Sequence, residues 1–207
     1  VDEVLARLDA SDDPAVWLDV EPADALRLAA KELTATAPEA RGPLWGVPFA
    51  VKDNIDVAGR TTTAGLPGTA YVAEATAPAV ARLLAAGALY VGKTNLDQLA
   101  TGLVGTRSPY GVPRNPFDAS LVPGGSSSGS AVAVATRQVA FALGADTAGS
   151  GRVPAALCGI VGLKAAPGAV PTEGVVPASP TIDCVSTFAR SVADGLVVES
   201  TMAAGTW

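Results

Sequence analysis

The chain of 207 residues contains no histidine. Histidine is the commonest general base and the commonest transition-metal ligand in proteins, so acid–base chemistry here would need another side chain. Two cysteines, Cys158 and Cys184, are too few for a disulfide framework or a zinc site. We therefore expect no metal site, and the sequence implies no cofactor.

Charged residues and long apolar runs are also scarce. Charged residues make up 16% of the chain, and the formal net charge is −6. An acidic chain without a basic run is a poor match for nucleic acid or for an anionic membrane surface. No apolar run reaches transmembrane length, and the first ten residues lack the pattern of a signal peptide. These features favour a cytoplasmic enzyme or binding protein.

Small and apolar residues are abundant. Hydrophobic residues make up 49% of the chain, which predicts a sheet that is covered on both faces. Short apolar runs alternate with helical patterns, and this alternation is typical of an α/β fold with a mixed, mostly parallel sheet. We expect strands at 47–51, 88–91, 139–143 and 160–163. We expect helices in the first ten residues and at 22–36, 78–86, 95–101 and 129–137.

Local signals bound two of these helices. Thr76 is placed to cap the helix at 78–86, and Gly87 is placed to end it. Thr94 and Asp97 have the spacing of a capping box for the helix at 95–101. The following stretch, 104–123, contains four prolines and predicts a long loop, a feature that is often functional in compact chains.

Two Gly/Ser-rich turns, GGSSSGS at 124–130 and AGSGR at 148–152, flank a small apolar connector. The first turn resembles a phosphate-binding loop, but Ser130 stands where that loop requires lysine. It also fits the G-x-S-x-G nucleophile elbow with Ser127 at its centre, a motif whose chemistry needs a histidine base. Two purely structural turns are the remaining interpretation.

Lysine is the base that could activate a serine in a chain without histidine. A neutral lysine accepts a hydroxyl proton if burial lowers its pKa. Lys52, Lys93 and Lys164 each follow an apolar run, so position alone does not choose among them. For each, the alternative is a charged group at a strand end with its stem packed on apolar surface.

Several motifs in order resemble the amidase signature family. They are GVPFAVKDN at 46–54, GKTNLDQLA at 92–100, NPFD at 115–118, GGSSSGS at 124–130, GADTAGSGRVPAALCGIVGLK at 144–164 and DCVSTFARSVAD at 183–194. The resemblance implies an amidase domain of which 1–207 is the N-terminal and catalytic-core portion. Residues 1–41 would form a helical lead-in, and 42–195 the signature core.

The resemblance implies a Ser–cis-Ser–Lys triad. Matched by motif, Lys52 is the base, Ser126 is the serine that follows a cis peptide bond, and Ser150 is the nucleophile. The backbone N–H groups of the turn would form the oxyanion hole, and these belong to Thr147, Ala148, Gly149 and Ser150. The expected reaction is hydrolysis of an amide through an acyl-enzyme.

Two departures from the common motif indicate a branch of the family. Ala148 stands where most members have glycine, and Gly151 stands where isoleucine or valine is usual. The run DTAGSGRVPAA resembles the allophanate hydrolase branch, which implies cleavage of allophanate (urea-1-carboxylate) with release of ammonia and carbon dioxide. Another small-amide or carboxybiuret-type amidase is the alternative, and a non-catalytic homologue is a second. The amidotransferase component that makes Gln-tRNA fits less well.

A carboxylated substrate needs a positive or hydrogen-bonding clamp. Arg107, Tyr110 and Arg114 in the long loop are candidates, together with Ser127 beside the triad. Family members have amidase domains about twice as long as this chain. We therefore expect an incomplete sheet and pocket wall, completed by a further segment, and association into a homodimer.

Overall fold

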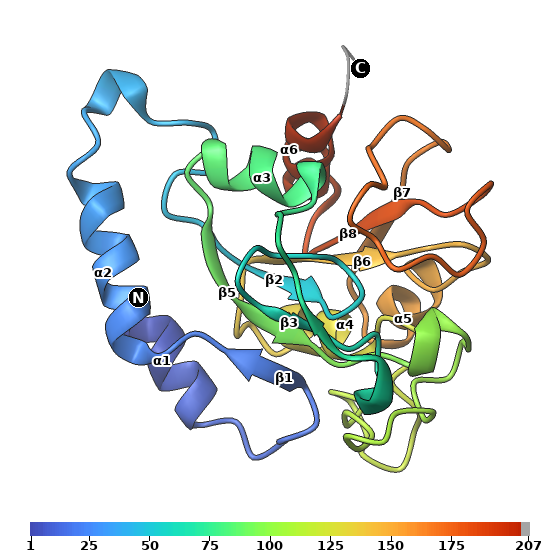
Figure 1. Ribbon diagram of the computed structural model, residues 1–207. Coiled ribbons are helices and arrows are strands. Elements are labelled where there is room, and N and C mark those ends of the chain that lie inside the picture. Colours follow the sequence, from blue (N-terminus) through green and yellow to red (C-terminus); the bar gives the residue numbers. More distant parts are fainter. Residues whose placement is uncertain (204–207) are drawn as a thin grey trace.

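The computed structural model describes residues 1–203 and builds them around one six-stranded mixed sheet (Figure 1). Its strands are β1 (Trp17–Val20), β2 (Pro48–Lys52), β5 (Leu89–Thr94), β6 (Phe141–Ala145), β7 (Val161–Lys164) and β8 (Val185–Ala189). Their order is β1-β5-β2-β6-β8-β7. The central strands β5, β2 and β6 are parallel, whereas β1 and β8 run antiparallel to their neighbours.

Helices cover both faces of this sheet, as the composition predicts. They are α1 (Asp2–Asp9), α2 (Ala23–Thr34), α3 (Pro78–Ala85), α4 (Ser128–Ala135), α5 (Arg152–Leu157) and α6 (Val192–Met202). The core that includes α3 and α6 lies on one face, and the core that includes α1, α2, α4 and α5 lies on the other. Figure 1 shows α3 and α6 together above the sheet. The expected α/β architecture is confirmed.

Alternation along the central strands sorts side chains between the two cores. Phe49 and Val51 on β2 enter the α3/α6 core, while Ala50 between them enters the α4 core. The small side chains of α4 allow that helix to pack closely. A side chain at Gly129 would come within 2.4 Å of the Val16 carbonyl oxygen. This close packing brings the serine turn at the start of α4 against the sheet.

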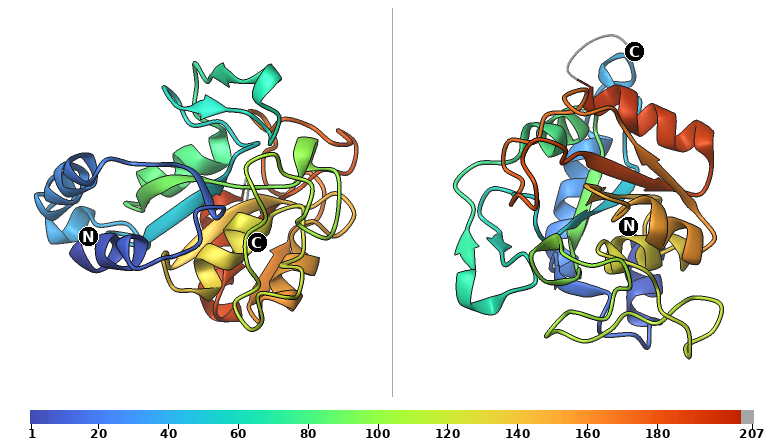
Figure 2. Two further views of the ribbon diagram at one scale, coloured as in Figure 1. Left: turned by 90° about the horizontal axis from the view of Figure 1, so that it is seen from below. Right: turned by 90° about the vertical axis from the view of Figure 1, so that its right-hand side faces the viewer.

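The remaining chain forms short elements and loops. A hairpin of β3 (Thr61–Thr62) and β4 (Tyr71–Val72) stands apart from the main sheet (Figure 2). Short 3-10 helices span Pro38–Ala40, Pro67–Thr69 and Gln98–Ala100. The segment between Ala100 and α4 has neither helix nor strand, so the predicted long loop is confirmed. Within residues 1–203, we find no helix with the length and apolarity that a bilayer crossing requires.

Two predicted helix signals are wrong. Thr76 does not cap α3, whose N-cap is Ala77, because the Thr76 hydroxyl accepts a hydrogen bond from the Ala58 N–H. Thr94 still belongs to β5, where its hydroxyl contacts Ser130, so the predicted capping box at Thr94 and Asp97 does not form. Only the 3-10 turn at Gln98–Ala100 remains of the helix expected there.

Candidate active site

Lys52 and the AGSGR turn converge on one edge of the sheet. Lys52 is the last residue of β2, and the turn at 146–151 directly follows β6. The two strands are parallel neighbours, with Val51 opposite Leu143. Carboxyl ends of parallel strands meet at the same sheet edge, so the register places the lysine beside the turn.

Lys52 contacts Ser126 directly. The Nζ atom donates a hydrogen bond to Ser126 Oγ at 2.7 Å, and both side chains are fully buried. The peptide bond between Gly125 and Ser126 is cis, as the resemblance implies. Of the three lysines that the sequence leaves open, Lys52 is the one that reaches a serine.

Burial favours the neutral form of Lys52, which is the form that can act as a base. Desolvation lowers the pKa of its ammonium to about 7, against the opposing influence of Asp97, Asp146 and Asp183. A substantial neutral fraction is therefore present near neutral pH.

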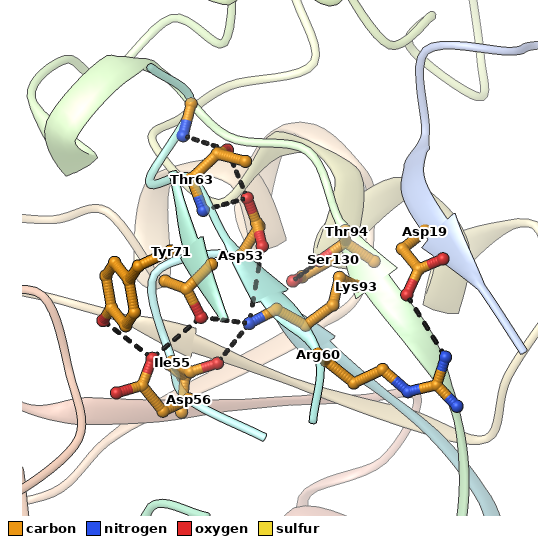
Figure 3. A network of polar contacts seen from close by, with 12 residues as sticks. Asp19, Asp53, Ile55, Asp56, Arg60, Thr63, Tyr71, Lys93, Thr94 and Ser130 are labelled. Carbon is orange, nitrogen blue, oxygen red and sulfur yellow. Dashed lines mark hydrogen bonds and ion pairs between the residues drawn. The ribbon is translucent and has the colours of Figure 1, made fainter. Parts of the chain in front are cut away.

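Lys93 is also buried, but it belongs to a different network (Figure 3). Its Nζ lies 3.4 Å from Asp53 Oδ1 and donates to the Ile55 carbonyl and to Thr62 Oγ1. Leu89 and Val91 face the α4 core. Since every second side chain of a regular strand lies on the same face, Lys93 would also face that core if β5 were regular. A register shift in the β2–β5 pairing instead sets Lys93 opposite Val51, which faces the other core.

Lys164 lies elsewhere, half-buried at the end of β7, where its Nζ donates to the Ala165 carbonyl. Position in the sequence does not indicate which of the three lysines could act on a serine. Their contacts in the folded structure do.

The turn after β6 is built on Asp146. Its carboxylate accepts hydrogen bonds from the N–H groups of Gly149, Gly151 and Arg152, and from the Arg152 guanidinium at 2.9 and 3.0 Å. Burial alone would raise the pKa of Asp146, but these hydrogen bonds hold it below its usual value. The turn is therefore fixed by a buried anion at its centre.

Three of the four predicted oxyanion donors remain available in this turn. The Gly149 N–H is committed to Asp146 Oδ1 at 2.8 Å, which differs from its expected role. The N–H groups of Thr147, Ala148 and Ser150 have no hydrogen-bond acceptor within residues 1–203. A cluster of free amides beside a serine is a donor set suited to an oxyanion.

The two serine turns touch through the backbone. The Ser127 N–H donates to the Ser150 carbonyl at 3.2 Å, and the Ser150 hydroxyl is directed to the Gly102 carbonyl at 3.4 Å. Among the described residues, no hydrogen bond joins the hydroxyls of Ser126 and Ser150 directly. The structure thus brings the three predicted triad residues to one edge, with Lys52 and Ser126 already in contact.

Two buried carboxylates beside this edge were not predicted as site residues. Asp97 accepts hydrogen bonds from the Gly105 and Arg107 amides, and its own N–H donates to the Ser126 carbonyl. Asp183 accepts from the Thr147 hydroxyl and from the Ser179 amide. Both lie inside the signature motifs at 92–100 and 183–194, but their partners are mostly backbone amides, which no residue pattern specifies. The i, i+6 spacing of Asp146 and Arg152 in DTAGSGR was visible in the sequence.

The predicted substrate-binding residues are dispersed. Ser127 is fully buried and its hydroxyl donates to the Ala145 carbonyl, so that side chain is not available to a ligand. Arg114 pairs with Asp12 of the N-terminal loop at 2.9 Å. Arg107 and Tyr110 are exposed on the long loop. Arg107 lies along Gly102, whose carbonyl faces Ser150.

Comparison with known proteins shows the family to which the chain belongs. The family model described as Amidase matches residues 1–205. The chain belongs to the amidase family. It is 52% identical over 185 residues to the urea amidolyase of Lachancea kluyveri, which is 89% of this chain and 10% of that protein.

The solved allophanate hydrolase of Kluyveromyces lactis superimposes with a TM-score of 0.90 at 45% identity, covering 98% of this chain and 34% of that one. Other branches match as well. The related component of the glutamyl-tRNA(Gln) amidotransferase of Symbiobacterium thermophilum is 52% identical over 156 residues, covering 74% of this chain and 32% of that protein. The chain thus spans a tenth to a third of these relatives, and identity alone does not separate the branches.

Proposed function

We propose that this chain forms the catalytic core of an amide hydrolase in which Ser150 is the nucleophile, Ser126 relays its proton and Lys52 is the base. The observation that carries the proposal is the 2.7 Å contact between Lys52 Nζ and Ser126 Oγ at a buried lysine. A base works best with a pKa near the operating pH, and burial brings the pKa of Lys52 to about 7.

The reaction follows from these positions. Neutral Lys52 takes the Ser126 proton, Ser126 takes the Ser150 proton, and Ser150 Oγ attacks the amide carbonyl carbon. The free N–H groups of Thr147, Ala148 and Ser150 stabilise the resulting oxyanion. The proton then returns through Ser126 to the departing amine as the C–N bond breaks. Water cleaves the acyl-enzyme by the same relay.

This relay needs the hydroxyls of Ser126 and Ser150 to come within hydrogen-bonding distance. Catalytic hydrogen bonds are often long in the free enzyme and shorten when substrate binds. The backbone bond from Ser127 to the Ser150 carbonyl already holds the two turns together, so a side-chain rotation at Ser150 away from Gly102 is the main change required.

Allophanate is the proposed substrate. The similarity to urea amidolyase and to allophanate hydrolase supports it. Arg107 supplies the positive charge that the substrate carboxylate requires, because its side chain lies along Gly102 beside the nucleophile. Tyr110 lies three residues further along the same loop and would line the entrance.

The amidotransferase match supports a second candidate, another small-amide amidase of the same family. Such an enzyme would share the triad but would not require a carboxylate on its substrate. A non-catalytic homologue would keep the fold without a reactive Ser150.

A fluorophosphonate probe and a substrate panel test these candidates in the intact protein. We expect labelling of Ser150, no labelling in Ser150→Ala, and ammonia release from allophanate that exceeds release from biuret, malonamide and aliphatic amides. Faster release from uncarboxylated amides would favour the second candidate. Labelling that persists in Ser150→Ala would move the nucleophile elsewhere, and an unlabelled wild-type protein would indicate a non-catalytic homologue.

A further inference from the structure

Asp97 is a buried carboxylate beside the triad that the proposed reaction does not yet use. Its side chain is fully buried, and no lysine or arginine nitrogen lies within ion-pair distance of it in residues 1–203. An ionised carboxylate in such a place is costly unless hydrogen bonds or a nearby positive charge stabilise it. Two N–H groups, from Gly105 at 3.0 Å and Arg107 at 2.7 Å, supply part of that stabilisation.

We propose, building on the function proposed above, that Asp97 is a positioning residue which provides the counter-charge for Lys52 during proton relay and fixes Ser126 opposite that lysine. Contacts with the main chain support the second part of this role, the positioning of Ser126. The Asp97 N–H donates to the Ser126 carbonyl at 3.0 Å, and a side chain at Gly125 would come within 2.1 Å of Asp97 Oδ2. The carboxylate therefore packs directly against the peptide that carries Ser126.

The charge balance of the reaction explains the need for such a group. When Ser150 attacks, a proton moves through Ser126 to Lys52, which becomes an ammonium with no contact to solvent. Without a fixed negative charge nearby, that ammonium would be strongly disfavoured. A carboxylate at Asp97 stabilises the charged lysine until the proton passes to the leaving amine.

Asp97, Asp146 and Asp183 act electrostatically on Lys52, and the charge of Asp97 is the least compensated of the three. All three favour the charged form of the lysine, and Asp97 does so most strongly. Asp146 is already paired with the Arg152 guanidinium. Asp183 is 8% exposed and accepts hydrogen bonds from Thr147, Ala178 and Ser179. The Lys93–Asp53 pair faces the opposite core, so it is not a competing partner.

The rate at which a fluorophosphonate labels Ser150, measured against pH in the intact protein, tests this role without an amide substrate. In the wild type we expect the rate to rise through a midpoint near 7. Asp97→Asn removes the negative charge, so neutral Lys52 is favoured and the midpoint should fall by about one pH unit. Asp97→Ser provides a second neutral side chain of smaller size and should shift the midpoint the same way.

Asp97→Glu is the matched control because it disturbs the packing but keeps the charge. It should slow labelling while leaving the midpoint at the wild-type pH. Neutral variants with a wild-type midpoint, or a Glu variant whose midpoint falls as theirs does, would overturn the inference but leave the proposed triad intact. A wild-type protein without pH-dependent labelling of Ser150 would instead overturn the triad itself.

Thermal unfolding provides a second readout that does not depend on reactivity. Lys52→Met leaves the Asp97 charge buried without its partner. If Asp97 is the counter-charge, adding Asp97→Asn to Lys52→Met should raise the melting temperature, whereas a purely structural Asp97 would make the double variant less stable than the single one.

Discussion

At the scale of single residues, the buried lysines Lys52 and Lys93 differ in the face of the sheet on which each side chain lies. The two lysines lie on adjacent parallel strands. Because the pairing between β2 and β5 contains a register shift, their side chains point toward opposite faces of the sheet. Burial also lowers the pKa of Lys93, but Lys93 contacts the Asp53 carboxylate and the Ile55 carbonyl, which favour its charged form and leave it no hydroxyl of a proposed nucleophile to act on. The side chain of Lys52 is hydrogen-bonded to the neutral Ser126 hydroxyl, and burial lowers its pKa to about 7 against the opposing charges of Asp97, Asp146 and Asp183.

The rate of the proposed reaction should therefore depend on a single deprotonation near neutrality. Activity requires neutral Lys52, so kcat/KM should rise as pH increases through about 7 and then level off. Lys52→Arg should be at least roughly a thousandfold slower across this range, because guanidinium does not lose its proton. A pH profile of ammonia release checks both points. An arginine variant with a near-normal rate would exclude Lys52 as the base.

The proposed triad and the supporting carboxylates Asp97 and Asp183 all lie in linear motifs, but only the triad residues carry a chemical role that the sequence pattern indicates. Lys52, Ser126 and Ser150 follow apolar runs or sit in Gly/Ser turns. Asp97 acts through the amides of Gly105 and Arg107 and through the Ser126 carbonyl. Any residue can supply a backbone amide, so the motif that contains Asp97 does not indicate which groups it binds.

At the scale of elements, the turn between β6 and α5 depends on one ion pair. Asp146 is fully buried and binds three turn amides, while Arg152 holds that carboxylate from the solvent side with two hydrogen bonds. The geometry of the free amides at Thr147, Ala148 and Ser150 follows from this anchor.

Arg152→Met should loosen the turn between β6 and α5, which carries the proposed oxyanion donors, without removing any reacting group. Misplaced donors stabilise the oxyanion of the transition state less well but leave substrate binding nearly unchanged, so kcat should fall roughly tenfold to a hundredfold with little change in KM. Steady-state kinetics of ammonia release measure this split. Arg152→Lys keeps the charge but not the paired geometry and should be intermediate. A change confined to KM would show that Arg152 contacts substrate instead.

The strands and helices that could be predicted are those with a strong local pattern. The expected strands at 47–51, 88–91, 139–143 and 160–163 correspond to β2, β5, β6 and β7. The strand β1 was missed, because four half-buried residues on the sheet edge carry little alternation. The helix expected at 95–101 fails for a tertiary reason, since the Asn95, Asp97 and Ser108 side chains bind the backbone and one another across the loop.

Helix α6 carries a buried acid that should make stability depend on pH. Burial raises the pKa of the Glu199 carboxyl from its ordinary value of 4.5 to about 7, which the nearby Thr187 hydroxyl opposes only in part. Between these two pH values the unfolded chain loses a proton that the folded protein keeps, so stability falls as pH rises through this window.

Glu199→Gln removes this titration and should stabilise the protein by roughly 2 kcal/mol above pH 7, with little effect at pH 4. Denaturant unfolding of the two proteins at both pH values makes the comparison. Equal stability differences at pH 4 and pH 8 would mean that Glu199 is ionised in the folded state.

At the scale of the whole molecule, the long loop exposes an unusual amount of apolar surface. Among residues 1–203, eight of the 17 exposed large apolar side chains lie between residues 99 and 122, including Phe117 and Leu121. The chain also spans only 34% of the solved allophanate hydrolase it resembles. Exposed apolar patches on soluble proteins mark surfaces that are covered by other chain or by a partner. We propose that this loop surface is covered in the intact protein, by further chain or in a homodimer.

The 207-residue polypeptide on its own should therefore self-associate as its concentration rises, because burying the loop surface removes apolar area from water. Sedimentation velocity over a concentration series measures this. Leu121→Ser, at a side chain that is 57% exposed on the loop surface, should weaken the association. Leu28→Ser is the matched control, since Leu28 is 58% exposed but lies on α2, away from that loop, and it should leave the association unchanged. The two variants remove the same apolar side chain at nearly equal exposure, so a difference between them reports on location alone. A polypeptide that sediments as a 20.5 kDa monomer at every concentration would contradict the proposal that this surface needs a cover.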